Sequence, residues 1–368
     1  MIAGATVALL APSAGGTLSG GFLVNRALAR IPEIDQIDAT SAAELERALD
    51  RAADATPLVD SLYLFDEATA RVLACAAAAR PVILLAHSLP SLIPGPAPAA
   101  RRAMIARERA FLSRAHGAVA PSRFMAGALE RRGLARTAVA EPAPVCDGRS
   151  ATRGSRHAFA AGAPVRILTV ANRTRAKGIV DAAEAVRRFD RGGDRWHWTI
   201  VGSREADPES AAEFDSFVRR HGLADRIAEL PPQAPQTLSR YYEQADVFLL
   251  PSYMESYGLV FAEAITFGVP AVGYRCGGVP EVVADAGVLV TPGDTDALAS
   301  GIAAAARRPE SGTPGRLSRA TATCAPRPAR ADLHARLRRR AATLPDGEAS
   351  IAAFREAIRT VLATRRPR

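Results

Sequence analysis

Short, continuous apolar segments alternate with amphipathic segments of helical length along most of this chain. Clear apolar segments lie at residues 6–12, 165–170 and 246–250. Apolar runs of this length are typical of strands buried on both faces of a parallel sheet, and the amphipathic segments between them are typical of covering helices. The pattern predicts an α/β fold built from parallel sheets.

The same alternation predicts further elements. We expect strands at residues 58–65, 82–86, 118–120, 196–201, 226–230 and 269–273, and helices at 22–30, 67–79, 101–114, 179–189, 209–221, 258–268 and 350–363. Residues 141–164 have no periodicity and are rich in Pro, Gly, Ala and Arg, which is typical of an interdomain linker. We therefore predict an N-terminal domain over residues 1–145, a linker over 146–164, a C-terminal domain over 165–330 and C-terminal helices over 331–368.

The strongest candidate site is the loop and helix that follow the apolar segment 246–250. We expect Ser256 to be the N-cap of the helix, which leaves the N–H groups of residues 258–260 free to bind a phosphate. Glu263 would lie roughly 7–10 Å further along the helix, about the reach from a diphosphate to a ribose. Glu255, in the loop, would face whatever is attached beyond the phosphate, and a carboxylate there suits a neutral polyol.

Two segments of the N-terminal half could face this site. Gly20 and Gly21 belong to a glycine-rich loop before a helix, where backbone can approach a ligand closely, although a plain tight turn is the alternative. Their spacing matches neither a dinucleotide-binding motif nor a Walker loop. His87 follows a predicted strand, at the sheet edge where ligands bind, although a loop histidine without a role is an equal alternative.

The loop after strand 165–170 carries three cations beside a helix start. These are Arg173, Arg175 and Lys177, and Lys177 is the single lysine of the chain. Because the chain otherwise uses arginine in place of lysine, the one lysine merits a functional hypothesis. A bound diphosphate needs a cationic partner, and Lys177 could supply it.

Length and composition are consistent with two globular domains. The chain has 368 residues, of which 48% are hydrophobic and 5% aromatic. Its four cysteines are far apart and show no metal-ligand spacing, so we expect a reducing compartment. The chain has no segment of about 20 apolar residues, so we expect no transmembrane helix. We interpret the apolar start, residues 1–24, as a strand and loop rather than a signal peptide, because no positive charge precedes Arg26.

The net charge of +9 belongs to one end of the chain. Residues 307–368 contain 15 arginines and five acidic residues, which leaves the rest nearly neutral. No aromatic interleaving or nucleic-acid motif accompanies these arginines, so we expect no nucleic-acid partner, although a tail that binds RNA or DNA is a separate hypothesis. The basic helix 101–114 is expected to pack on the sheet, with docking on an anionic membrane surface as the alternative.

The stretch 246–294 strongly resembles the donor-binding signature of the retaining family 4 glycosyltransferases of GT-B fold. The resembling segments are Pro251-Ser252, Glu255-Ser-Tyr-Gly258, Glu263-Ala264, Gly268-Val-Pro270, Gly277-Gly278-Val-Pro-Glu281 and Pro292-Gly293-Asp294. The resemblance covers nearly the whole chain, is strongest over residues 165–306 and is weaker before residue 118. It implies two Rossmann-like parallel-sheet domains that face a central cleft, with a C-terminal helix that crosses back to the first domain.

The resemblance also implies roles for individual residues. The donor-binding set would be Gly20, Gly21, Gly202, Gln233, Ser256, Tyr257, Gly258, Leu259, Val260 and Glu263, and Glu255, Lys177 and His87 would serve catalysis, His87 on the acceptor side. Lys177-Gly178 matches the family, but the usual arginine position, five residues earlier, is Asn172. Arg173 or Arg175 would have to serve instead, and the sequence leaves this choice open.

The resulting hypothesis is a metal-independent glycosyltransferase that moves a sugar from a nucleoside-diphosphate sugar to an acceptor with retention of configuration. No cofactor or metal is expected, because Asp294 in the Asp-Thr-Asp sequence 294–296 precedes an apolar helix and is better explained as its N-cap. We expect a cytoplasmic protein, with peripheral contact at the inner membrane face as an option. The alternatives are a non-catalytic GT-B protein that binds nucleotide sugars and a nucleotide-sugar epimerase. Donor base, sugar, acceptor, pathway and oligomeric state stay open.

Overall fold

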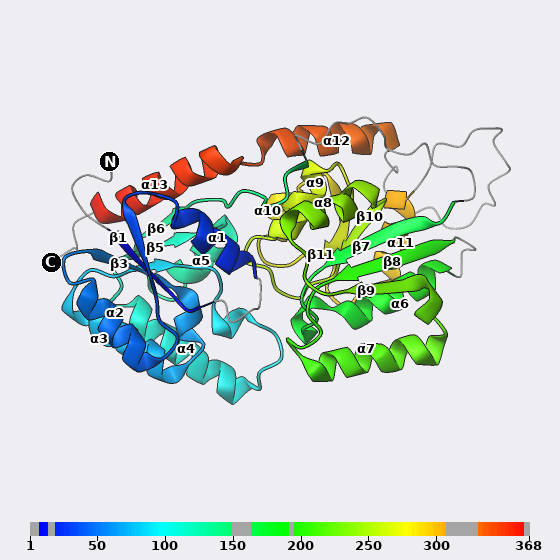
Figure 1. The fold of residues 1–368 in the computed structure, drawn as a ribbon. Helices are drawn as coiled ribbons and strands as arrows, with labels where there is room; N and C mark the ends of the chain where they lie inside the picture. The colour runs from blue at the N-terminus through cyan, green and yellow to red at the C-terminus, as the bar shows by residue number, and fades with distance from the viewer. Residues whose placement is uncertain (1–6, 14–18, 149–162, 191–194, 307–329, 364–368) are drawn as a thin grey trace.

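Two lobes, each built on a six-stranded sheet, make up the computed structural model, which describes residues 7–13, 19–148, 163–190, 195–306 and 330–363 (Figure 1). The strand orders are β2-β1-β3-β4-β5-β6 and β12-β11-β10-β7-β8-β9, and every strand pairing is parallel. Parallel strands must be joined by crossovers, which is why helices alternate with strands throughout. The predicted α/β architecture is confirmed.

The N-terminal lobe begins with a fully buried strand, and most of its helices start at polar N-caps. Ser41 and Glu44 form a capping box at α2, and Asp66 and Ser122 cap α3 and α5. The elements are β1 Val7–Ala11, α1 Gly20–Leu28, β2 Ile34–Asp38, α2 Ala42–Arg51, β3 Thr56–Asp60, η1 Ser61–Leu64, α3 Glu67–Ala79, β4 Ile83–Leu85, η2 Pro90–Leu92, α4 Pro98–Leu112, β5 Gly117–Ala120, α5 Arg123–Glu130 and β6 Thr137–Val139.

The C-terminal lobe repeats this alternation. Strand β10, whose four residues are all buried, lies in the middle of its sheet, as its uniformly apolar sequence requires. The elements are β7 Val165–Val170, η4 Arg175–Lys177, α6 Ile179–Asp190, β8 Trp196–Val201, α7 Pro208–His221, η5 Ala224–Arg226, β9 Ile227–Leu230, α8 Pro235–Gln244, β10 Val247–Leu250, α9 Leu259–Thr266, β11 Ala271–Tyr274, α10 Val279–Val283, β12 Gly287–Val290 and α11 Thr295–Ala306.

Two further helices connect the lobes. Helix α12 (Arg330–Thr343) lies along the C-terminal lobe and α13 (Gly347–Ala363) lies along the N-terminal lobe, so the pair bridges both (Figure 1). Phe354, Ile358 and Val361 of α13 are buried in the same cluster as β1 and β4. The end of the chain thereby completes the core of its beginning. Within the described residues, no helix is long and apolar enough to span a membrane.

Direct contacts also hold the lobes together. The carboxylate of Glu281, in α10, accepts hydrogen bonds from the backbone N–H groups of Arg123 and Phe124 at 2.8 and 2.6 Å. These are free donors at the start of α5, so a side chain of one lobe caps a helix of the other. Ser122 Oγ donates to the Ser256 carbonyl at 2.5 Å. Both contacts lie beside the loop that carries Glu255.

Two expectations about local structure in the N-terminal lobe were wrong. The strand expected over residues 58–65 ends at Asp60, because the Asp60 carboxylate accepts from the Leu62 N–H and turns the chain into η1. Gly20 and Gly21 are the first residues of α1 rather than a loop before it. For helix α4, Phe111 and Leu112 are buried in the N-terminal core, as the packing interpretation expected. Residues 307–329 and the middle of the expected linker lie outside the described residues.

Candidate functional site

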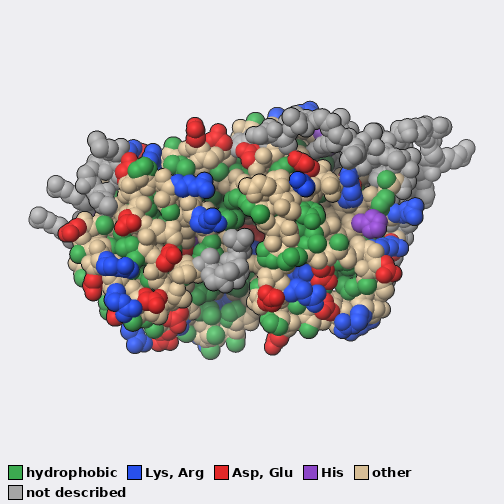
Figure 2. All heavy atoms as spheres, in the orientation of Figure 1, with side chains coloured by type: hydrophobic (Ala, Val, Ile, Leu, Met, Phe, Trp, Pro, Cys, Tyr) green, Lys and Arg blue, Asp and Glu red, His purple; other side chains and the backbone are tan. Residues whose placement is uncertain are grey.

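A cleft of about 610 Å³ lies between the lobes and is lined by residues of both. In the space-filling view, the lobes meet at a narrow recess with hydrophobic side chains at its edge (Figure 2). A volume of this size is within the range of small-molecule sites in proteins. The candidate residues that line it are Gly20, Gly21, His87, Lys177, Gly202, Gln233, Glu255, Ser256, Tyr257, Gly258, Leu259, Val260 and Glu263.

The starts of α1 and α9 face each other across this cleft. A Cβ atom added to Gly20 would lie 3.5 Å from Leu259 Cδ1. Neither helix has a side-chain cap, and within the described part of the chain no acceptor takes the N–H groups of Gly20, Gly21, Leu259 or Val260. Two helix N-termini that meet at one cleft form a region of positive potential suited to an anion.

The start of α9 differs from the expectation in one respect. The N-cap is Gly258 and not Ser256, and Gly258 has φ of +105°, a conformation that L side chains rarely adopt. The carbonyl of Ser256 is bound by Ser122, and the Tyr257 hydroxyl donates to Glu141 at 3.4 Å. Ser256 and Tyr257 thus line the cleft while they tie the lobes together. The glycine leaves the first N–H groups of α9 uncovered.

Lys177 and Glu255 form the charged pair of the cleft. Lys177 Nζ donates to Glu255 Oε1 at 2.7 Å, and Ser252 Oγ donates to the same oxygen at 2.7 Å. The lysine side chain is 28% exposed and the glutamate 13%. The pair places a cation in the same cleft as the α9 N-terminus and orients the carboxylate.

Glu263 is almost fully buried, at 4% exposure, with three donors around it. Tyr242 donates from its hydroxyl at 2.7 Å, and the N–H groups of Val145 and Cys146 donate at 3.2 and 3.3 Å. Burial raises the Glu263 pKa to about 7 although these donors lower it. The residue therefore connects α8, α9 and the start of the interdomain segment, a role that the sequence did not reveal.

His87 is held by two polar side chains of the N-terminal lobe. Asn25 Nδ2 donates to Asp60 at 2.7 Å, so its Oδ1 is the acceptor that faces His87 Nε2 at 2.8 Å. This arrangement assigns the proton to Nε2 and leaves Nδ1 as an acceptor. Burial lowers the His87 pKa, which favours the neutral ring. A Cβ on Gly21 would lie 3.1 Å from the imidazole, so this position needs the room that glycine leaves.

Neither arginine of the loop before α6 reaches the cleft, and this expectation was wrong. Arg173 is 1% exposed, forms an ion pair with Glu229 and lies over the Phe214 ring. The exposed Arg175 side chain pairs with Glu213 at 3.6 Å. The loop instead presents Asn172 to the cleft, with its Oδ1 bound to the Ser203 N–H at 3.0 Å. The charge on that side of the site comes from Lys177.

The Asp-Thr-Asp sequence lies elsewhere. Asp294 Oδ1 accepts from the Ala297 N–H at 2.8 Å at the start of α11, and Asp296 pairs with Arg188. The capping interpretation of Asp294 is confirmed. Among the described residues, no group of three or more His, Cys, Asp or Glu side chains could hold a metal ion.

Comparisons with known proteins relate part of this chain to glycosyltransferases. Residues 156–320 match the family model described as "Glycosyl transferases group 1". Similarity to curated proteins includes the amylovoran biosynthesis glycosyltransferase AmsK of Erwinia amylovora, 32% identical over 145 residues, 37% of this chain and 35% of that protein. A D-inositol 3-phosphate glycosyltransferase of Mycobacterium marinum is 39% identical over 103 residues, 27% of this chain and 22% of that protein. These matches therefore span about a third or less of each relative.

Solved structures are similar over nearly the whole chain. A sucrose-phosphate synthase from Thermosynechococcus elongatus superposes with a TM-score of 0.71 at 19% identity, covering 97% of this chain and 99% of that one. The HepE protein of Anabaena, in complex with UDP-glucose, gives a TM-score of 0.72 at 17% identity, covering 96% and 98%. At these identities the likeness shows the fold, and the GT-B expectation is confirmed.

Proposed function

We propose that this chain, which carries a group 1 glycosyltransferase domain within a GT-B fold, moves a sugar from a nucleoside-diphosphate sugar to an acceptor hydroxyl. The observation that carries the proposal is the joint placement of the two facing helix N-termini, the Lys177–Glu255 pair and Glu263 in one cleft. HepE structures with UDP and UDP-glucose, of the same fold, support a nucleotide-sugar donor. The curated relatives named as glycosyltransferases support transfer.

The donor occupies the C-terminal wall of the cleft in this proposal. Its diphosphate binds the N–H groups of Leu259 and Val260, Glu263 accepts from the ribose, and Glu255 faces the sugar. The base lies between Gly202 and Gln233, beside the apolar wall at Val170 and Pro235. Gly20 and Gly21 close the diphosphate site from the other lobe.

The reaction exchanges one C–O bond for another. The acceptor oxygen bonds to the anomeric carbon, the bond from that carbon to the phosphate oxygen breaks, and the nucleoside diphosphate leaves with the electron pair. The acceptor proton passes to the leaving phosphate. Lys177 and the helix N-termini stabilise the negative charge that develops there, so no metal ion is required. Attack from the face that the phosphate leaves gives retention of configuration.

Donor binding tests the first half of this proposal. Because a ligand that binds the folded state alone raises the melting temperature, a panel of nucleoside diphosphates and their sugars should give a shift with one base series. Glu263→Ala should abolish the shift, and Glu243→Ala, which changes an exposed carboxylate of α8, should keep it. No shift for the wild type at millimolar ligand would refute the donor site.

Product analysis tests the second half. Incubation of the bound donor with a mixture of acceptors should give a new glycoside whose anomeric configuration matches that of the donor. A free epimerised sugar formed without any acceptor would identify an epimerase instead. Donor binding without turnover under either condition would identify a non-catalytic binding protein.

A further inference from the structure

The two walls of the cleft carry different chemistry. The C-terminal wall presents Lys177, Glu255 and Glu263, whereas no arginine, lysine or carboxylate among the described residues of the N-terminal lobe lines the cleft. Arg26, the basic residue of α1, is exposed and lies outside the lining. The stretch 14–18, which precedes α1 in the chain, contains no basic residue in its sequence.

Apolar side chains dominate the N-terminal wall. They include Leu23, Leu62, Phe65, Leu85, Ile93 and Pro121. The polar side chain among them that is best placed to meet a ligand is His87, whose free Nδ1 can accept a hydrogen bond from a hydroxyl. This wall thus combines one neutral acceptor group with a broad hydrophobic surface.

Phe65 is the most exposed part of this surface. The described residues contain three exposed large hydrophobic side chains, Phe65 and Val139 at 40% and Val145 at 38%, and both Phe65 and Val145 line the cleft. Phe65 belongs to the N-terminal wall, whereas Val145, whose N–H binds Glu263, lies beside the donor residues. An exposed aromatic ring that lines a cavity points to a ligand that covers it.

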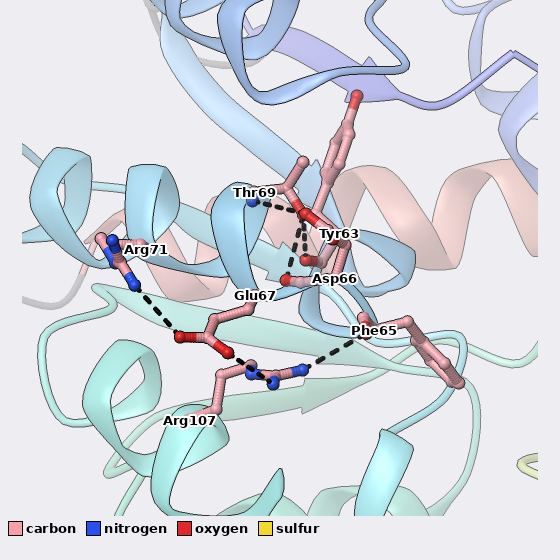
Figure 3. Close-up of polar contacts among 7 residues, drawn as sticks. All are labelled: Tyr63, Phe65, Asp66, Glu67, Thr69, Arg71 and Arg107. Carbon is pink, nitrogen blue, oxygen red and sulfur yellow. Dashed lines mark hydrogen bonds and ion pairs between the residues drawn. The ribbon is translucent and has the colours of Figure 1, made fainter. Parts of the chain in front are cut away.

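The turn that carries Phe65 is held from several sides. Arg107 of α4 donates to the Phe65 carbonyl at 3.3 Å and pairs with Glu67 at 3.6 Å, and Thr69 Oγ1 donates to the Tyr63 carbonyl at 2.6 Å. Figure 3 shows this polar cluster, with the Phe65 ring extending away from it. An exposed ring on a backbone held by these contacts is the arrangement expected of a preorganised contact.

From this chemistry we propose that the N-terminal wall binds an uncharged acceptor that carries an apolar group beside the hydroxyl to be glycosylated. The inference rests on the proposed transferase function and names its acceptor class. An anionic acceptor would lose its hydration on this wall without a charged partner, whereas an alkyl or aryl group gains from burial against Phe65, Leu62 and Ile93.

A series of glucosides tests the acceptor class. With the donor found in the binding panel, transfer rates are measured for methyl, octyl and phenyl β-D-glucoside and for glucose 6-phosphate. Octyl β-D-glucoside is kept below its micelle-forming concentration. At about three- to four-fold per buried methylene, we expect its kcat/KM to exceed that of the methyl compound by at least about 30-fold. A larger gain for octyl than for phenyl identifies a lipid-like acceptor, and the reverse identifies an aromatic one.

Two variants make the test specific to this surface. Phe65→Ala should reduce the octyl-to-methyl or phenyl-to-methyl ratio of kcat/KM by about ten-fold and leave donor binding unchanged. Val139→Ala, an equally exposed position outside the cleft, should leave the ratio unchanged. A ratio that stays constant in Phe65→Ala would overturn the assignment of the surface.

The acceptor class and the transferase function fail in different ways. Transfer to glucose 6-phosphate with a kcat/KM above those of both hydrophobic glucosides would overturn the acceptor class while the transferase function stands. Absence of any donor shift in the binding panel would overturn the function itself. Equal rates for the methyl, octyl and phenyl compounds would also overturn the acceptor class, because the wall would then make no contact with the apolar group.

Discussion

The two lobes share one architecture, yet the residues with which they line the cleft differ in chemistry and in their positions along the sequence. Much of the C-terminal wall is concentrated at α9, with Glu255, Gly258, Leu259 and Glu263 in or beside this helix, and Lys177 joins them from the loop before α6. The N-terminal wall collects side chains from α1, η1, β4 and the loops after them, and most of these are apolar. The difference follows from what each wall binds in our proposals.

A diphosphate is the same in every donor, so helix N-termini and one cation suffice to bind it. An acceptor is recognised by its shape and by a few polar contacts, which any set of apolar residues around a fixed polar group can provide. The comparison therefore predicts that substitutions in the C-terminal wall affect the chemical step, whereas those in the N-terminal wall affect the choice of acceptor.

The largest effect is expected for Lys177→Met. The change removes the cation of the anion site and leaves Glu255 without its 2.7 Å partner, and loss of one stabilising group at a developing charge costs about 10²–10³ in kcat. Steady-state kinetics with a fixed acceptor measure it. Arg240→Met, an exposed basic residue of α8, is the control and should leave the rate unchanged. A decrease in kcat of less than about five-fold would exclude Lys177 from the mechanism.

The second prediction is that ionisation of the Glu263 carboxyl makes the free energy of unfolding depend on pH. Its folded-state pKa of about 7 lies above the ordinary value of 4.5, so between these values the folded protein keeps a proton that the unfolded chain releases. The free energy of unfolding should therefore fall by about 3 kcal/mol as pH rises from 4.5 to 7.

Glu263→Gln has no proton to lose, so its stability relative to the wild type should rise across this window. Urea unfolding at a series of pH values measures the difference, in which contributions of other groups cancel. Glu243→Gln, at an exposed position, should show a constant difference. Parallel profiles for Glu263→Gln and the wild type would mean that the carboxyl titrates normally.

A smaller effect is expected in the other wall, for His87→Ala. The change removes one neutral acceptor of a hydrogen bond, which corresponds to about three- to ten-fold in the KM for the acceptor. Donor binding should stay the same, since His87 follows β4 in the N-terminal lobe and Glu263 belongs to α9 in the C-terminal lobe. His197→Ala, at an exposed position of β8, is the control. An equal loss of donor affinity would contradict the proposed assignment of the donor to the C-terminal wall and the acceptor to the N-terminal wall.

The strength of the local sequence signal decided which elements could be predicted. The largely apolar strand β7, the uniformly apolar strand β10 and the motif around α9 were placed within a residue or two, because buried strands and helix N-termini leave local signals. The edge strand β2, with the sequence IDQID, was missed because its polar positions break the apolar pattern. Helix α2 was missed although Ser41 and Glu44 spell a capping box.

Side-chain direction was the part that sequence could not supply. Arg173 and Lys177 belong to one loop, but the turn of the backbone sends the first toward Glu229 and the second toward Glu255. Tyr242 contacts Glu263 from a helix 21 residues away, and no pattern within α8 marks that contact. Phe65 appeared to be the end of a buried strand and is instead exposed at the cleft.

The smallest effect is expected outside both walls, at Asp294. Its carboxylate caps α11 through the Ala297 N–H, so Asp294→Ala should lower the free energy of unfolding by about 1 kcal/mol. Because the cap does not line the cleft, kcat/KM should stay at the wild-type value, with or without a chelator in the assay. Asp294→Ser, which can also cap, should recover most of the stability. A loss of activity in both variants at unchanged stability would instead assign the Asp-Thr-Asp sequence to catalysis, and the anion site would then need a metal ion in addition to Lys177 and the two helix N-termini.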